Sequence, residues 1–136
     1  MKIAIIADDT KKELMCQFCT AYCGILSKHE LSATGVTARY ISDYTGLEVE
    51  SLMSGEFGGE QQIASRIAYG EVDILLDFIG TRSDRLSAPN FVEMIKMCGQ
   101  YNVPVALNMG TAEALIIALD RGDLDWRLYM KEARTD

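Results

Sequence analysis

Lysine, threonine, serine and glycine residues follow three apolar segments in the first half of the chain. They are Lys12, Thr34, Gly35, Thr37, Ser54 and Gly55. Hydroxyl groups donate hydrogen bonds to phosphate oxygens, a lysine adds a positive charge, and glycine lets backbone N–H groups approach closely. Any one of these residues could equally be a helix cap or a turn residue. As a set they favour a binding site for a small phosphorylated substrate or inorganic phosphate.

Carboxylates stand in the same strand-end positions of the sequence: Asp8, Asp9, Glu56, Glu60 and Asp77. A carboxylate beside a bound phosphate can act as a general base, and Glu60 is the best placed for that role. Glu60 could instead stabilise the first turn of its own helix. Asp77 ends an otherwise apolar segment, so it must be paired, hydrated or functional, and Arg82 or Arg85 could pair with it.

A parallel sheet would bring these residues together at one edge. Strand patterns alternate with helical patterns along the chain, as in repeated βα units. We predict strands over Lys2–Ala7, Glu30–Thr34, Val49–Ser54, Val72–Phe78 and Val103–Leu107. We predict helices over Lys11–Lys28, Thr37–Tyr44, Glu60–Tyr69, Phe91–Tyr101, Thr111–Leu119 and Leu124–Ala133. The fold class is therefore α/β: a single doubly wound domain, residues 1–136, with five mostly parallel strands and helices on both faces.

The composition limits the partners of the protein. The chain has 136 residues and a net charge of -7, with no basic stretch for nucleic acid or anionic lipid, so neither partner is expected. The N-terminus reads as a first strand of a cytoplasmic protein and shows no signal-peptide pattern. Cys16, Cys19 and Cys23 fall in one predicted helix and are expected to be buried thiols, and no metal or organic cofactor is predicted. His29, the only histidine, is expected to be a helix-end cation.

One segment carries a specific family resemblance. It reads Ser54-Gly55-Glu56-Phe57-Gly58-Gly59-Glu60-Gln61-Gln62. Together with the segment 108–113, Asn-Met-Gly-Thr-Ala-Glu, it resembles the methylglyoxal synthase family over nearly the whole chain. The resemblance implies a lyase that converts dihydroxyacetone phosphate into methylglyoxal and inorganic phosphate, a bypass of glycolysis, without metal or organic cofactor. It also implies a homohexamer.

The resemblance implies a phosphate site that is largely retained and a catalytic set that has changed. The matching phosphate positions are Lys12, Thr34, Thr37, Ser54 and Gly55, with Val36 in place of a third threonine. Glu60 replaces the aspartate that is the family's usual base, and one extra methylene moves the carboxylate by about 1 Å.

Other positions of the catalytic set also depart from the family. Asp8 stands for a histidine, Gly80 for an aspartate, Ser87 for a histidine, Asn90 for an aspartate and Lys96 for an arginine, whereas Asp9 is retained. The catalytic candidates are therefore Glu60, Asp8, Asp9 and Asn90.

Three hypotheses remain open at this point. The first is a synthase of reduced activity that uses this catalytic set. The second is an enzyme for another small phosphorylated carbonyl compound, whose remote end Asp77, Arg82 and Arg85 would contact. The third is a regulatory or ligand-binding protein that keeps the phosphate site without catalysis. Near the C-terminus, Arg127 and Lys131 are either solvated helix charges or groups that reach a neighbouring subunit's site.

Overall fold

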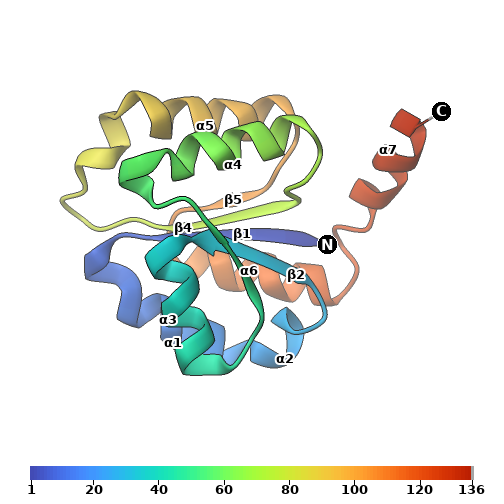
Figure 1. The fold of residues 1–136 in the computed structure, drawn as a ribbon. Coiled ribbons are helices and arrows are strands. Elements are labelled where there is room, and N and C mark those ends of the chain that lie inside the picture. The colour runs from blue at the N-terminus through green and yellow to red at the C-terminus, as the bar shows by residue number, and fades with distance from the viewer. Residues whose placement is uncertain (136) are drawn as a thin grey trace.

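The computed structural model describes residues 1–135 and forms a parallel sheet between two layers of helices (Figure 1). The strands are β1 (Lys2–Ala7), β2 (Glu30–Thr34), β3 (Val49–Leu52), β4 (Ile74–Phe78) and β5 (Val105–Ala106). Their order is β3-β2-β1-β4-β5, and every neighbouring pair is parallel. The predicted α/β class, with five strands and helices on both faces, is confirmed.

Helices connect the strands and extend beyond the last one. The α-helices are α1 (Lys12–Ala21), α2 (Cys23–Leu26), α3 (Gly35–Thr45), α4 (Gly59–Ala68), α5 (Pro89–Gln100), α6 (Met109–Asp120) and α7 (Trp126–Thr135). Three short 3-10 turns are η1 (Asp9–Lys11), η2 (Gly55–Phe57) and η3 (Asp84–Ser87). Within residues 1–135, no helix combines the length and the apolar character that crossing a membrane requires.

The central strand β1 divides the core into two halves. Its Ile3 and Ile5 belong to the cluster beneath α1, α3 and α6, whereas Ala4 and Ile6 belong to the cluster beneath α4 and α5. Successive side chains of a strand point to opposite faces, so a strand buried on both faces is apolar at every position. Figure 1 shows the same division, with α4 and α5 on one side of the sheet and α1, α3 and α6 on the other.

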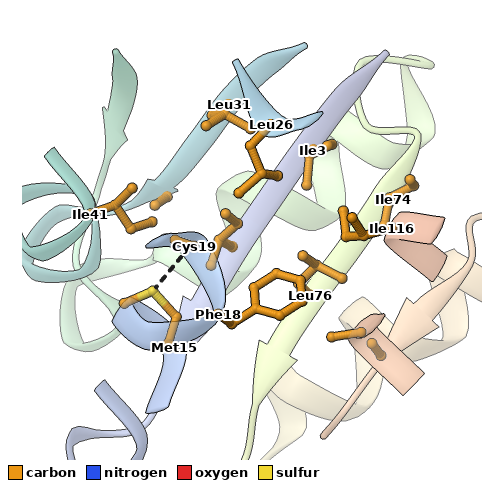
Figure 2. Close-up of a cluster of buried hydrophobic side chains, with 14 of the residues drawn as sticks. Ile3, Met15, Phe18, Cys19, Leu26, Leu31, Ile41, Ile74, Leu76 and Ile116 are labelled. Atoms are coloured by element: carbon orange, nitrogen blue, oxygen red, sulfur yellow. Dashed lines mark hydrogen bonds between the residues drawn. The ribbon is translucent and has the colours of Figure 1, made fainter. Parts of the chain in front are cut away.

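Three cysteines, Cys16, Cys19 and Cys98, lie in this core, whereas Cys23 is less buried than expected. Figure 2 shows Phe18 and Cys19 of α1 packed toward the sheet, and Cys19 donates a hydrogen bond to the sulfur of Met15 at 3.7 Å. Cys16, Cys19 and Cys98 are buried and Cys23 is half-buried. Burial raises the pKa of Cys19 and of Cys98 to about 12, so both stay protonated at neutral pH.

Most predicted elements differ from the observed ones by one or two residues at an end, and two differ more. The long first helix is interrupted at Tyr22, whose φ of -107° and ψ of 22° are not helical. The fifth strand is only two residues long, because Pro104 has no N–H group and cannot donate to the sheet. Its carbonyl still accepts a hydrogen bond from the N–H of Leu75 at 3.0 Å.

The environment of Arg127 contradicts both predictions made from the sequence, a solvated helix charge and a group that reaches a neighbouring subunit's site. It is buried, its Nε donates to Oδ1 of Asp73 at 3.2 Å, and its Nη1 donates to the carbonyl of Asn102. The other oxygen of Asp73 accepts the N–H of Lys2 at 2.8 Å. Arg127 therefore attaches the start of α7 to the sheet and is neither solvated nor free to reach a neighbouring subunit. The side chain of Lys131 lies outside the described part of the structure.

His29 also differs from its expected role. Its Nδ1 lies 2.9 Å from the amine of Met1, and the ring is half-buried. Burial first, and then the positive amine of Met1, lower the pKa of His29. The expectation of a helix-end cation is wrong, because both effects favour the neutral ring.

Candidate active site

A cavity of about 620 Å³ opens where β1, β2 and β3 end. Parallel strands place their carboxyl ends at one edge of the sheet, which is why residues far apart in the sequence meet there. The lining consists of Ile6, Ala7, Asp8, Asp9, Lys12, Thr34, Val36, Thr37, Ser54, Gly55, Phe57, Glu60 and Arg85. Most of the predicted site residues are therefore brought together.

One end of the cavity is formed by Lys12 and hydroxyl groups. Lys12 is buried, and its Nζ donates to the carbonyl of Ala7 at 2.6 Å and to Oγ1 of Thr37 at 3.4 Å. Oγ1 of Thr34 lies 3.3 Å from Oγ1 of Thr37. An ammonium group and two hydroxyl groups within one hydrogen-bonded cluster provide the donors that a phosphate dianion requires.

The hydroxyl groups of Thr34 and Ser54 are not used as helix caps. Thr34 precedes α3 and Ser54 precedes η2, but neither side chain accepts a capping hydrogen bond. A serine or threonine at such a position usually satisfies a free N–H group of the first turn. Both residues line the cavity, and the absence of a capping bond favours the binding interpretation over the capping one.

Three carboxylates surround the guanidinium group of Arg85, and two of them, Asp8 and Glu60, line the cavity. Nη1 of Arg85 lies 2.7 Å from Oδ1 of Asp8 and 3.0 Å from Oδ1 of Asp77. Nη2 lies 2.6 Å from Oδ2 of Asp77 and 3.0 Å from Oε2 of Glu60. The pairing predicted for Asp77 is thus made by Arg85, and Arg82 is exposed. Asp77 is fully buried and lies outside the cavity lining, so it contacts the guanidinium from the protein side.

The surroundings shift the pKa values of two of these carboxylates in opposite directions. Burial raises the pKa of Asp77 even though Arg85 favours its ionised form. Burial also acts on Asp8, but the N–H of Gly80 and the guanidinium of Arg85 outweigh it and lower the pKa of Asp8. Asp8 is therefore the stronger acid of the two and stays ionised at neutral pH.

Two glycines allow the backbone to surround the cavity closely. A Cβ atom on Gly59, the first residue of α4, would lie 2.4 Å from the carbonyl of Met53 and 2.9 Å from Cγ2 of Thr34. The N–H of Gly80 donates to Oδ2 of Asp8 at 2.8 Å, and a Cβ atom there would lie 2.6 Å from Oγ1 of Thr10. Gly80 thus lets the loop after β4 close onto Asp8.

Other predicted residues lie at the margin of the site or outside it. Gly35 is the first residue of α3 and is absent from the cavity lining. Asn90, in the first turn of α5, is exposed and also absent from the lining, so the structure does not bring it to Glu60. Ser87 is exposed as well. Asp9 lines the cavity, but its carboxylate is fully exposed and lies 3.6 Å from Nζ of Lys12.

Arg85 is the site residue that the sequence identified least well. The sequence offers it as one of two partners for Asp77 and as one of three residues that could contact the remote end of a substrate, but it does not predict the contact with Glu60. The available signal was a carboxylate at the end of an apolar strand, followed eight residues later by an arginine. Such a carboxylate requires a partner, but the sequence does not show which other groups that partner contacts.

The fold and the lining residues define an α/β protein with a polar cavity at the strand ends, and comparisons with known proteins assign its family. Residues 15–107 match the model of the MGS-like domain. Methylglyoxal synthase from Caldicellulosiruptor saccharolyticus is 50% identical over 93% of this chain and 90% of the relative. Methylglyoxal synthase from Geobacillus sp. (strain WCH70) is 47% identical over 93% of this chain and 91% of the relative.

A solved structure agrees with this assignment. The crystal structure of methylglyoxal synthase from Elizabethkingia anophelis NUHP1 superposes with a TM-score of 0.76 at 34% identity, and covers 85% of this chain and 76% of that one. The chain belongs to the methylglyoxal synthase family.

Proposed function

We propose that the protein is a methylglyoxal synthase, a carbon–oxygen lyase that eliminates phosphate from dihydroxyacetone phosphate to give methylglyoxal. The observation that carries the proposal is a single cavity with a phosphate-type cluster, Lys12, Thr34 and Thr37, at one end and the carboxylate of Glu60 at the other. This cavity occurs in a chain that is 50% and 47% identical to two proteins named methylglyoxal synthase. The ligand class is thus a small phosphorylated carbonyl compound.

The proposed reaction uses the two ends of the cavity in turn. The phosphate group binds to Lys12 and the hydroxyl groups, and Glu60 removes a proton from the carbon next to the carbonyl. The electron pair of that C–H bond moves onto the carbonyl oxygen and gives an ene-diolate. The hydroxyl group of the ene-diolate then loses its proton and becomes the aldehyde, the double bond shifts by one carbon, and the C–O bond to phosphate breaks, so that phosphate leaves as the anion that its site already binds. The remaining enolate takes up a proton at its CH2 carbon to give methylglyoxal, and the protons taken from carbon and from the hydroxyl group return to this carbon and to phosphate. Asp8 and Asp9 are proposed to arrange the substrate.

The experiment that tests the proposal is methylglyoxal release from dihydroxyacetone phosphate by the purified protein. We expect Glu60→Gln to lower kcat by at least about 100-fold, since general-base catalysis contributes roughly 10²–10⁴-fold. Glu93→Gln changes an exposed carboxylate on α5 and serves as the matched control with unchanged turnover. A rate that Glu60→Gln leaves unchanged contradicts the assignment of the base.

A second candidate function is phosphate binding without catalysis. It is favoured by the engagement of Glu60 with Arg85 and by the exposed positions of Ser87 and Asn90 outside the cavity. Thermal melting with inorganic phosphate and with dihydroxyacetone phosphate distinguishes the two functions. Stabilisation by both compounds without any methylglyoxal release would establish the binding protein. An intermediate case lies between full synthase activity and binding without catalysis. In that case, which we propose, the protein releases methylglyoxal more slowly than synthases that have an aspartate base.

We further propose that the protein is a cytoplasmic homo-oligomer, a hexamer by its family resemblance. The supporting observation is helix α7, which extends away from the sheet (Figure 1) and exposes Trp126, Leu128, Tyr129 and Met130. Large apolar side chains gathered on one projecting helix are typical of an interaction surface. Light scattering after gel filtration should give the mass of six chains, and the mass of one chain would contradict the proposal.

A further inference from the structure

Arg85 contacts the cavity and Glu60 in addition to its partner Asp77, and the pairing with Asp77 alone does not require these further contacts. Its guanidinium lines the cavity, while the Asp77 carboxylate holds it in two-point contact from the buried side. Nη2 is shared between Asp77 and Glu60, at 2.6 Å and 3.0 Å. The ring of Phe91 lies 5.5 Å from the guanidinium carbon and limits its movement further. A fixed cation therefore stands directly beside the proposed base.

Proton transfer changes the charges around this cation in a defined way. Glu60 is negative before the transfer and neutral after it, whereas the carbonyl oxygen of the substrate is neutral before and negative after. Hydrogen bonds to ionised acceptors are about twice as strong as those to neutral ones. The N–H of Nη2 that contacts Glu60 in the free protein thus has a stronger acceptor in the oxyanion once the proton has moved.

Arg85 is the cation that contacts the proposed base in the described part of the structure. Among the described residues that line it, the cationic side chains are Lys12 and Arg85. The Nζ of Lys12 donates to the carbonyl of Ala7 and to Oγ1 of Thr37, whereas Arg85 donates to Glu60. A guanidinium does not lose its proton in proteins, so Arg85 can stabilise the oxyanion by charge and hydrogen bonding but cannot act as a general acid.

We propose that Arg85 is a catalytic residue that stabilises the ene-diolate by moving one N–H hydrogen bond from Glu60 to the substrate oxyanion, and that Asp77 is the residue that positions it. The inference rests on the proposed function. The C–H bond breaks, its proton goes to Glu60, and its electron pair goes to the oxygen that Arg85 contacts. In the elimination the hydroxyl group of the ene-diolate loses its proton and becomes the aldehyde, and the electron pair of the C–O bond leaves with phosphate. The remaining enolate takes up a proton at its CH2 carbon, and Arg85 contacts Glu60 again once the carboxyl has given up its proton. Fixed charges aimed at the site of developing charge need no reorganisation during the reaction.

Kinetics of Arg85→Gln test the inference. We expect kcat to fall about 100-fold with KM changed less than about threefold, because the contact forms only in the transition state and the intermediate. Free guanidinium ion should restore part of the rate to Arg85→Ala. Arg82→Gln, in the same loop but exposed, is the matched control with unchanged kinetics. The inference is overturned if Arg85→Gln keeps the wild-type kcat, whether or not its KM rises.

A binding experiment separates this inference from the proposed function. The carboxylate of 2-phosphoglycolate has the planar shape and charge of an ene-diolate, whereas inorganic phosphate occupies only the phosphate end. The wild type should bind 2-phosphoglycolate at least about tenfold more tightly than phosphate, and Arg85→Gln should lose that difference while keeping its phosphate affinity. Equal 2-phosphoglycolate affinities of wild type and variant overturn the role of Arg85. Absence of turnover in the wild type, in contrast, overturns the proposed function.

A double variant tests the role of Arg85 in a protein that keeps its fold. Arg85→Gln alone leaves the buried carboxylate of Asp77 without its cation, which can unfold a protein. Asp77→Asn combined with Arg85→Gln replaces the ion pair by a neutral pair of similar shape, so its melting temperature should stay near that of the wild type. This folded variant should show the same loss of kcat and of 2-phosphoglycolate affinity. Asp77→Asn alone should lower kcat about tenfold without weakening phosphate binding, and a wild-type kcat in that variant would show that Asp77 does not position Arg85.

Discussion

Nη2 of Arg85 lies 3.0 Å from Oε2 of Glu60 and 2.6 Å from Oδ2 of Asp77, so the proposed base is connected to the central sheet through one nitrogen atom. Glu60 belongs to α4, Asp77 is the last residue but one of β4, and Arg85 belongs to η3 in the segment that follows β4. The position of the carboxylate is therefore set by a contact outside its own helix. The length of the side chain at position 60 must match that contact.

Glu60→Asp should lower methylglyoxal release although it introduces the carboxylate that is usual in the family. An aspartate is one methylene shorter, so its oxygens withdraw by about 1 Å from Nη2 of Arg85, and misplacement on that scale can cost about 10²-fold. We expect kcat about 10–100-fold below that of the wild type, measured with dihydroxyacetone phosphate. A faster Glu60→Asp enzyme would show instead that the Arg85 contact restrains the base.

Lys12→Met should weaken the binding of inorganic phosphate by about 10–100-fold, the size expected for losing a charge-assisted hydrogen bond. Nζ of Lys12 is buried between the carbonyl of Ala7 and the hydroxyl of Thr37, with its charge directed to the phosphate end of the cavity. Calorimetric titration with phosphate measures the change. Lys11→Met removes the neighbouring lysine, which does not line the cavity, and should bind phosphate like the wild type.

The sequence predicted the fold well because its signals are local. Runs of apolar residues such as Ile74–Leu76 identify strands buried on both faces, and the order of strands and helices then implies a parallel sheet. The ends of β1 and β2 were predicted to the residue, since Asp8 and Gly35 end the two apolar runs. The short β5 was less predictable because its length depends on hydrogen bonding around Pro104.

The site was predicted where it depends on the strand ends and was missed where it depends on side-chain conformation. Lys12 and Thr34 lie together because parallel strands end at one edge, a property of the fold. The direction of Arg85 and the exposed position of Asn90 depend on the path of the loop after β4. That path is fixed by contacts such as Gly80 with Asp8, between residues 72 positions apart, which no sequence pattern reveals.

Gly59→Ala should destabilise the protein by at least about 1–3 kcal/mol, because the new methyl group would lie 2.4 Å from the carbonyl of Met53 and 3.1 Å from the carbonyl carbon of Ser54. Both neighbours are backbone atoms and cannot rotate away. Chemical denaturation measures the effect, and phosphate affinity should fall with it since Ser54 lines the cavity. Gly99→Ala, in α5 with no atom within 4 Å of the new methyl group, should instead stabilise by about 0.5–1 kcal/mol. Equal stabilities of the two variants would contradict the close contact at Gly59.

His29 should make the stability of the protein depend on pH below about 6.5, its ordinary pKa. Its pKa is lowered in the folded state, first by burial and then by the amine of Met1, with Lys28 acting in the same direction and Asp120 and Asp73 opposing them. Below its ordinary pKa of about 6.5 the unfolded chain therefore binds a proton more readily than the folded one. Its contribution to stability is present above that value and is lost as the pH falls toward the folded pKa.

The measurement is the free energy of unfolding of the wild type and of His29→Gln at about pH 7 and about pH 5. The wild type should lose more stability than the variant over this interval, because glutamine keeps a polar side chain but does not titrate. The raised pKa of Asp77 acts in the opposite direction and is common to both proteins, so it cancels in the comparison. Equal losses in the two proteins would show that His29 has the same proton affinity folded and unfolded, and hence that its burial against the start of β1 does not determine its charge.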